Sequence, residues 1–288
     1  IISADSVQVY RHMDVGTDKP DPSWRRRVPH HLVDILDPDE EFNVALFQRW
    51  VFELVPQIRG RGRIPLLVGG SPLYVYAVVD RYLFPAGGQN PAVRAGLMAE
   101  AARRGPLALH RRLAEVDPES AARIHPHNVR RVVRALEVFH LTGQPISRLQ
   151  GRGPEGRVAM FGLTRPRPSL YRHIEERVDR MLARGLVEEV RRLLAMGYGP
   201  ELRSMQALGY KEVAAYLRGE VTLEEAVRLI KRNTKRFAKR QLSWFGRDTR
   251  IRWLDVDALG GPPGAARAIA SCKELSAVAG EAGRPSKL

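Results

Sequence analysis

The first residues of the chain bring together side chains that could take part in acid–base chemistry. Ile1 and Ile2 form an apolar pair typical of the end of a β-strand, and Asp5 follows between Ser3 and Ser6. The carboxyl end of a buried strand is where α/β domains present side chains to a ligand. Asp5 could therefore act as a general base or contact a metal ion. An equally good alternative is that it caps the next helix.

A second candidate site follows the segment IPLLVGGSPLY at residues 64–74. Its apolar run predicts a short buried strand, its two glycines a tight turn, and Ser71 the start of a helix. At such a junction, backbone N–H groups can face an anion. The alternative is a tight turn that binds no ligand.

Arginines near a third predicted strand form another group of candidates. Arg165, Arg172 and Arg177 lie near the exit of a strand at 158–166 or along the helix after it. Two helices are expected there, at 168–184 and 186–196, with Gly185 between them. The guanidinium fork matches phosphate oxygens, and arginines placed there often clamp a phosphate. They are equally compatible with solvated helix residues.

The longest predicted helix, at 222–245, is strongly basic. Thr222 and Glu225 have the spacing of a capping box at its start. Between residues 228 and 252 there are ten basic residues and one acid, Asp248. Solvated faces usually mix signs, so this stripe favours contact with a phosphate backbone. The expected inward residues are Leu223, Ala226, Leu229, Ile230, Phe237 and Trp244, and the expected basic stripe is Arg228, Lys231, Lys235 and Lys239, with Arg232, Arg236 and Arg240 beside it.

Further helices must position these groups. Asn43 is expected to cap a helix with apolar residues at helical spacing up to residue 58. Asn128 is expected to cap a second helix, which Gly143 ends. Glycine and proline clusters near 85–91 and 151–156 then divide the chain. The predicted parts are a first core segment at 1–84, a helical insertion at 85–156, a second core segment at 157–257 and a poorly packed tail at 258–288.

Composition limits the class of protein. The 47 Lys and Arg against 32 Asp and Glu give a net charge of +15, which favours an acidic partner such as nucleic acid. The single cysteine, Cys272, excludes an intramolecular disulfide and fits a reducing cytoplasm. No apolar run is long enough to span a bilayer. We expect a soluble, cytoplasmic protein with no membrane contact.

Six strings, taken in order, carry a resemblance to a known family. They are SADSVQVYRHMDVGTDKP, HHLVDI, LLVGGSPLY, HNVRRVVRALEV, LGYKE and FAKRQLSWF, spread over residues 3–245. The chain resembles the tRNA dimethylallyltransferases, also called isopentenyltransferases. The resemblance implies an α/β class of fold, with a nucleotide-binding, P-loop-kinase-like parallel sheet core flanked by helices and interrupted by a helical insertion. It also implies a monomer that uses Mg²⁺ and moves a dimethylallyl group from dimethylallyl diphosphate to N6 of the adenosine 3′-adjacent to the tRNA anticodon.

The resemblance also implies roles for particular residues. Asp5 matches the general base, and Ser71 matches a position that is usually Thr. Arg177 is the best match to an arginine that neutralises the leaving pyrophosphate. Gln206 departs from the family, which commonly has Arg there. The positions matched to contacts with the tRNA anticodon stem-loop are Asp5, Ser6, Val7, Gln8, Ser71, Arg94, Arg130, Arg131, Val132, Val133, Arg134, Gln206, Ala207, Leu208, Gly209, Tyr210, Lys211, Lys239 and Arg240.

One departure from the family lies at the start of the chain. The family begins with a phosphate loop of the type G-x-x-x-x-G-K-[ST], which this sequence does not contain. That loop would cradle the diphosphate and supply a hydroxyl to Mg²⁺. We therefore expect that the first strand and loop are missing, that this chain holds no metal ligand, and that it is inactive without them. A small-molecule P-loop kinase and a non-catalytic RNA-binding protein remain alternative functions.

Overall fold

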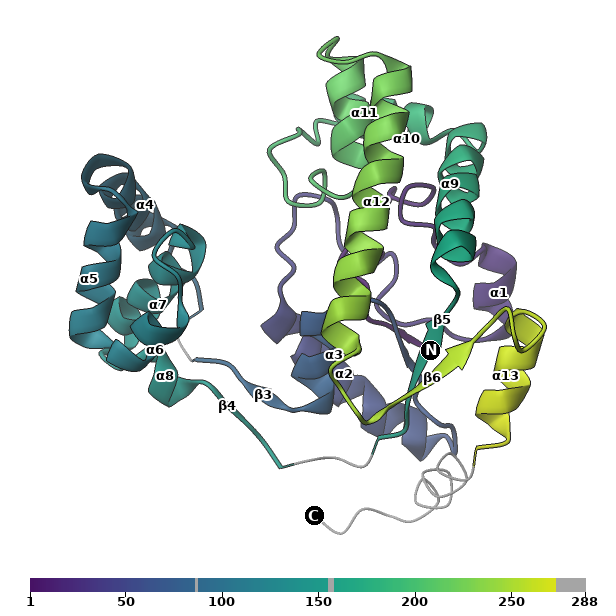
Figure 1. Cartoon of the computed structure of the whole chain (residues 1–288), viewed down its shortest axis with the longest axis horizontal. Coiled ribbons are helices and arrows are strands. Elements are labelled where there is room, and N and C mark those ends of the chain that lie inside the picture. Colours follow the sequence, from purple (N-terminus) through teal and green to yellow (C-terminus); the bar gives the residue numbers. More distant parts are fainter. Residues whose placement is uncertain (86–87, 155–157, 273–288) are drawn as a thin grey trace. The chain divides into compact units, whose positions relative to one another are not determined.

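The computed structural model describes residues 1–85, 88–154 and 158–272, and it divides into two compact units (Figure 1). The first, here called the core unit, comprises Ile1–Val78 and Arg157–Leu288. The second, the inserted unit, is Val79–Gly156. The sequence predicted that this unit starts at residue 85. It starts earlier, because its strand pair begins just after residue 80.

The strands of the core unit form two parallel pairs. β1 (Ile2–Ser3) pairs with β2 (Leu67–Val68), and its other edge meets His31, whose carbonyl accepts the Ser3 N–H at 3.0 Å. β5 (Met160–Thr164) pairs with β6 (Ile251–Asp255). In the described residues these pairs are not hydrogen-bonded into the one parallel sheet that we predicted. β2 is short because Pro65 precedes it and two glycines end it.

The helices of the core unit largely follow the sequence signals. The Asn43 side chain accepts hydrogen bonds from the Ala45 and Leu46 N–H groups at 3.1 and 3.0 Å, so the predicted N-cap is confirmed. Two helices predicted at 168–184 and 186–196 are also confirmed, and Gly185 between them has a φ of 90°. The helices are α1 (Pro22–Arg27), α2 (Val44–Gly60), α3 (Pro72–Val79), α9 (Arg167–Ala183), α10 (Leu186–Ala195), α11 (Tyr210–Leu217), α12 (Leu223–Phe245) and α13 (Pro262–Ala270).

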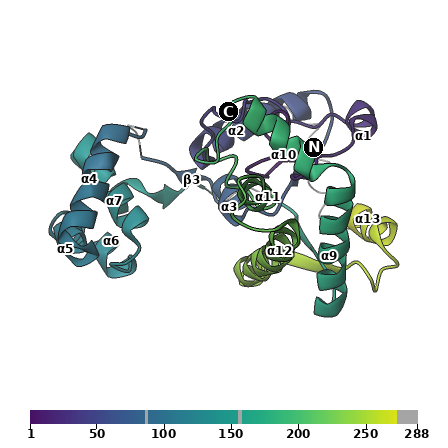
Figure 2. The same cartoon turned by 90° about the horizontal axis from the view of Figure 1, so that it is seen from above.

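The basic helix α12 corrects two predictions. Thr222 Oγ1 accepts the Glu225 N–H at 3.2 Å, but the Glu225 carboxylate binds Arg228, so the capping box does not close. Leu223 and Trp244 are exposed although they were expected to point inward. α12 packs on α9 and α11 (Figure 2), and its buried residues, Ala226 and Ile230, both lie in its first half. The second half of the helix has no buried residue.

One hydrophobic core fills the core unit. Phe42 lies near its centre and stacks on Trp50, with ring centroids 5.8 Å apart. Met13, Met205 and Tyr210 are completely buried in the same cluster. Met13 comes from the first loop, and Met205 and Tyr210 come from the segment before α11 and from its first residue, so the core joins two stretches that both carry candidate site residues.

The inserted unit has its own core. Leu113 and Val132 are completely buried in a cluster separate from that of the core unit. Asn128 precedes α7 without a side-chain capping bond, and Gly143 ends the helix in the left-handed conformation with φ 68°. The unit also contains an antiparallel strand pair, which the sequence did not predict. Its elements are β3 (Tyr82–Leu83), α4 (Pro91–Arg104), α5 (Pro106–Val116), α6 (Pro118–Arg123), α7 (Val129–Thr142), α8 (Ile146–Leu149) and β4 (Gly151–Arg152).

The start of the predicted tail is packed. α13 lies within the stretch that we expected to be poorly packed, and Ala265 and Cys272 are buried. A Cβ at Gly264 would lie 1.7 Å from the Leu259 carbonyl oxygen, so the helix and the preceding turn fit closely. The rest of the predicted tail, from residue 273, lies outside the described residues. Across the described ranges, no helix is long and apolar enough to cross a membrane.

Candidate functional site

The two predicted strand–loop junctions lie side by side. The Ala4 N–H donates to the Val68 carbonyl at 2.7 Å, which extends the parallel register of β1 and β2 toward their carboxyl ends. A Cβ on Gly69 would lie 2.4 Å from the Ala4 carbonyl oxygen, so only glycine allows this approach. Asp5 and Ser71 therefore both leave the same edge of the strand pair. This edge is the candidate active site.

Asp5 combines the two roles that the sequence left open. Its Oδ1 accepts the N–H groups of Val7 at 2.8 Å and Gln8 at 3.3 Å, as a capping carboxylate does. Its Oδ2 makes no hydrogen bond within the described part of the chain, and the residue is half-buried. The capping bonds hold the carboxylate while one oxygen stays available for a substrate.

The second junction is held against the basic helix. Gln241 of α12 donates a hydrogen bond from Nε2 to the Gly70 carbonyl at 2.6 Å. A Cβ at Gly70 would lie 2.1 Å from that nitrogen, so a side chain there would displace the Gln241 amide. Ser71 directly precedes α3, and its carbonyl accepts the Tyr74 N–H at 3.0 Å. Sequence reasoning did not single out Gln241; the paired glycines signal a close approach but not its partner.

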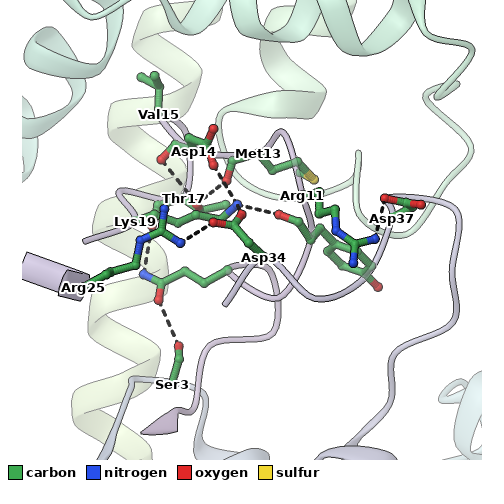
Figure 3. A network of polar contacts seen from close by, with 12 residues as sticks. Ser3, Arg11, Met13, Asp14, Val15, Thr17, Lys19, Arg25, Asp34 and Asp37 are labelled. Atoms are coloured by element: carbon green, nitrogen blue, oxygen red, sulfur yellow. Dashed lines mark hydrogen bonds and ion pairs between the residues drawn. The ribbon is translucent and has the colours of Figure 1, made fainter. Parts of the chain in front are cut away.

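A polar network fixes the loop that follows Asp5 (Figure 3). Lys19 is buried, and its Nζ donates to the Tyr10 carbonyl, to Asp14 Oδ1 at 2.8 Å and to Asp34. Arg25 also binds Asp34. Desolvation acts to raise the pKa of the Asp34 carboxyl, but the hydrogen bonds from Lys19 and Arg25 outweigh it and hold that pKa below its usual range.

Gln8 is part of the same loop rather than free to reach outward. Ser3 Oγ donates to Gln8 Oε1 at 2.9 Å, and Gln8 Nε2 donates to the Thr17 carbonyl at 3.2 Å. Both ends of the amide are therefore used inside the protein. The structure supports a role for Gln8 in shaping the loop beside Asp5, and its predicted contact with tRNA stays a prediction.

Arg177 lies on the exposed side of α9. Its Nε is 3.2 Å from Asp18 Oδ2, and Arg184 approaches the other oxygen of Asp18 at 3.5 Å. No hydrogen bond joins Arg177 to Asp5 or Ser71 in the described ranges. Its predicted role at the leaving pyrophosphate stays a prediction, and it would require Arg177 to exchange Asp18 for phosphate oxygens.

Acidic side chains of α9 lie against part of the basic stripe of α12. Lys231 lies 2.6 Å from Asp179 Oδ1, and Lys235 binds Glu175, so acids of α9 neutralise both lysines. The Lys235 ammonium holds the pKa of Glu175 below its usual range. Lys239, by contrast, is exposed and forms no ion pair in the described ranges. The predicted stripe thus contains lysines that acids of α9 neutralise and exposed cations, such as Arg232 and Lys239, that form no ion pair in the described ranges.

The arginines of the inserted unit fall into two groups. Arg94 and Arg134 bind the completely buried Glu137 at 2.7 and 2.9 Å. The Asn90 N–H also donates to that carboxylate, at 2.9 Å. Burial acts to raise the pKa of Glu137, but the hydrogen bonds from the two arginines outweigh it and lower the pKa. Arg130 is exposed, as is its neighbour Arg131, and in the described ranges neither makes an ion pair.

Three residues in the strings matched to tRNA contacts have buried side chains. Val132 and Val133 lie in the core of the inserted unit, and Tyr210 lies in that of the core unit. Apolar helical periodicity places the valines inward, and Tyr210 donates to Glu189 at 2.7 Å. These three side chains are buried within the protein, and the tRNA contacts predicted for their positions stay predictions.

The segment 206–211 borders a basic cavity of about 360 Å³. Gln206 is exposed, and its Nε2 donates to the Pro200 carbonyl at 2.6 Å. Lys211 and Arg232 line the same cavity; Lys211 Nζ lies 3.9 Å from Glu212, whereas Arg232 forms no ion pair in the described ranges. The remaining lining residues are Pro200, Glu212, Ala215, Arg218, Leu229 and Asn233.

The strand edge offers little to a metal ion held by protein alone. In the described residues, no group of three or more His, Cys, Asp or Glu side chains could hold one. Mg²⁺ often keeps several waters and is bound by one or two protein oxygens together with substrate phosphates. The available oxygens of Asp5 and Ser71 fit that second mode.

Comparison with known proteins identifies the relatives of this chain. The IPP transferase family model matches residues 8–248. The tRNA dimethylallyltransferase of Desulforudis audaxviator is 55% identical over 272 residues, covering 93% of this chain and 87% of the relative. That of Symbiobacterium thermophilum is 56% identical over 259 residues, covering 89% of this chain and 81% of the relative.

Solved structures agree with these relatives. A full-length tRNA isopentenylpyrophosphate transferase from Bacillus halodurans is 41% identical with a TM-score of 0.67, covering 98% of this chain and 88% of that one. A eukaryotic dimethylallyltransferase acting on tRNA has a TM-score of 0.79 at 25% identity, covering all of this chain and 74% of that one. Both the family model and the relatives span most of the sequence, and the chain belongs to the IPP transferase family, that of the tRNA dimethylallyltransferases.

Proposed function

We propose that this protein transfers a dimethylallyl group from dimethylallyl diphosphate to N6 of the adenosine 3′-adjacent to the anticodon of tRNA. Membership of the family supports the reaction. The observation that carries the assignment of the site is the half-buried Asp5 at the end of β1, with one oxygen fixed and the other available. A cytoplasmic monomer with a P-loop-kinase-like core belongs to the same proposal.

In this proposal Asp5 orients and deprotonates the attacking amine. The exocyclic amine of adenine is a poor nucleophile, because its lone pair is delocalised into the ring. Asp5 Oδ2 accepts a hydrogen bond from N6 and then takes the proton as the new C–N bond forms and pyrophosphate leaves. A positioned base of this kind contributes about 10²–10⁴-fold to the rate.

The leaving group requires positive charge. Mg²⁺ carried by the diphosphate would neutralise the oxygens of the leaving pyrophosphate, with the Ser71 hydroxyl as a protein oxygen close to it. Arg177 would add a guanidinium on release from Asp18. The phosphate loop predicted upstream of residue 1 stays a prediction.

The RNA would be held by exposed cations on each unit. Arg130 and Arg131 on the inserted unit and Lys239 and Arg240 on α12 are exposed and are not neutralised by acids in the described ranges. The cavity rim at 206–211 adds a further basic surface. The target adenosine must leave the anticodon-loop stack to reach Asp5, which costs roughly a few kcal/mol.

The test is a transfer assay with dimethylallyl diphosphate, Mg²⁺ and an anticodon stem-loop, with the RNA mass as readout. We expect transfer of one dimethylallyl group by the chain extended upstream with the predicted phosphate loop, and the variants below are compared in that extended chain. Asp5→Ala should lower transfer by about 10²-fold or more while leaving RNA affinity within a few-fold. Asp39→Ala is the matched control, because Asp39 is an exposed loop aspartate with no hydrogen bond in the described ranges. An equal loss of transfer and binding in Asp5→Ala would contradict the general-base role.

The same assay separates the alternative functions. A small-molecule kinase would show no salt-dependent affinity for the stem-loop. A non-catalytic RNA-binding protein would bind the stem-loop but leave its mass unchanged, also when the chain is extended upstream. If the RNA gains mass only with the extended chain, the predicted need for a phosphate loop is supported.

A further inference from the structure

Glu189 is a buried carboxylate that the proposed reaction does not use. It lies on α10 and is 1% exposed. Its two oxygens accept three successive backbone N–H groups, those of Asp14 at 3.0 Å, Val15 at 2.8 Å and Gly16 at 3.1 Å. Three consecutive N–H groups that converge on one anion form a strong binding site for negative charge. Here the anion is a side chain more than 170 residues away in the sequence.

The same carboxylate also binds the residue that begins α11. Tyr210 OH donates to Glu189 Oε1 at 2.7 Å, and both groups are buried. Burial raises the pKa of Tyr210 well above its usual value, and the negative charge of Glu189 raises it further. The hydroxyl therefore remains a donor over the working range of pH. The Tyr210 ring also packs on Gly16, where a Cβ would lie 2.4 Å from the ring carbon Cε2.

Each of the two anchored segments leads to a part of the candidate site. From the loop at 14–16, the path runs through the Thr17 carbonyl to Gln8 at 3.2 Å. The Gln8 N–H in turn donates to Asp5 Oδ1 at 3.3 Å. From Tyr210, the chain leads directly back into 206–209 and forward into Lys211 at the basic cavity. Glu189 is thus the common fixed point of the loop beside Asp5 and of the segment 206–211.

We propose that Glu189 is a positioning residue that couples the placement of Asp5 to the RNA-contacting segment 206–211 through its hydrogen bonds to the loop at 14–16 and to Tyr210. It does not touch substrate, because it is buried. This inference rests on the proposed function, since it concerns the geometry of that same site. It predicts that loosening this anchor affects both the chemical step and RNA recognition.

The experiment compares Tyr210→Phe, Glu189→Gln and the control Glu188→Gln in the transfer assay, with kcat and the KM for the stem-loop measured separately. Tyr210→Phe removes only the hydroxyl and keeps the ring against Gly16. Glu189→Gln keeps the shape but replaces one accepting oxygen with an NH₂ group. Glu188 is the next residue along α10, exposed and paired with Arg191 at 3.6 Å. Melting temperatures are recorded for all, and kinetics are measured well below the lowest of them.

We expect Tyr210→Phe to lower kcat and raise KM, so that kcat/KM falls by about tenfold. Glu189→Gln should lower kcat/KM by about 10²-fold, because small displacements of a reacting group have effects of this size. Glu188→Gln should match the wild type. Unchanged kcat and KM in folded Tyr210→Phe would overturn the proposal, even if its melting temperature fell or Glu189→Gln failed to fold. A wild-type chain that transfers no dimethylallyl group, also when extended upstream, would instead count against the proposed function.

Discussion

At the scale of single residues, the site depends on charged groups that are buried but fully hydrogen-bonded. Lys19 is held by a carbonyl and two carboxylates, although its side chain is only 3% exposed. A buried charge is tolerated only when its partners replace water, and removing one partner leaves it uncompensated. The Lys19–Asp34 pair therefore contributes to the order of the loop that follows Asp5.

This arrangement predicts a pH dependence of stability. The pKa of Asp34 is lower in the folded protein than its ordinary value of about 4, so its ionised form stabilises the fold above that pH, and the contribution is lost as the pH falls through the folded-state pKa. Asp34→Asn should lower the free energy of unfolding by about 2 kcal/mol near neutral pH. Urea unfolding between neutral pH and pH ~3 checks this, because the difference in the free energy of unfolding between wild type and variant should narrow as the pH falls. A constant difference would contradict the stabilising role of the ionised Asp34 carboxylate.

At the scale of elements, the pairing of α9 with α12 decides which cations can meet RNA. Asp179 and Glu175 of α9 bind Lys231 and Lys235, so these two lysines hold helices together. Lys239, one turn further along, has no acidic partner in the described ranges. Part of the stripe therefore joins two helices, and only the rest of it is available for the proposed contact with RNA.

Two single substitutions on one helix test this division. Lys239→Ala should weaken stem-loop binding and reduce the slope of log affinity against log salt by about one. Lys235→Ala is the matched control. It should leave the affinity and the salt slope nearly unchanged, because Glu175 already neutralises the Lys235 ammonium. Binding titrations at several salt concentrations give both quantities. Equal effects of the two variants would show that the ion pairs with α9 open on RNA binding.

How much of this was predictable depends on how local the determinants are. The N-cap at Asn43 and the break at Gly185 follow from neighbouring residues, and the sequence indicated them correctly. The exposure of Trp244 did not follow, because helical periodicity fixes a face but not what covers it. Glu189 was not singled out, since a glutamate on an amphipathic helix gives no sign of partners far away in the chain.

The candidate site shows the same limit. The adjacency of Asp5 and Ser71 follows from the rule that parallel strands end at one edge. The contact of Gln241 with Gly70 depends on the packing of a distant helix, which no local pattern encodes. Within 129–134, the apolar spacing by itself distinguishes the buried valines from the arginines. Matching the whole string to tRNA contacts ignored this distinction.

At the scale of the whole molecule, the two compact units have separate cores. The cluster around Leu113 and Val132 belongs entirely to the inserted unit, and the cluster around Phe42 belongs to the core unit. Glu137 adds a polar anchor inside the inserted unit, where it links the start of α4 to α7. A unit with its own core is expected to fold on its own.

We therefore expect a fragment that spans Val79–Gly156 to be helical and to unfold cooperatively. Leu113→Ala should lower its free energy of unfolding by about 2–4 kcal/mol because Leu113 is completely buried. Leu107→Ala is the control, since Leu107 lies on the same helix and is exposed. Far-UV circular dichroism on heating measures the helicity of the fragment and the stability of the two variants. A fragment without a cooperative transition would show that this core needs the rest of the chain.

The close fit of Gly16 against Tyr210 has a consequence for the set of sequences that can form this fold. A methyl group at position 16 would overlap the ring of Tyr210, and the ring cannot retreat because its hydroxyl is bound to a buried carboxylate. Positions 16 and 210 thus share one volume although they lie far apart in the chain. In a mutational library, a larger residue at 16 should therefore be accepted only together with a smaller one at 210.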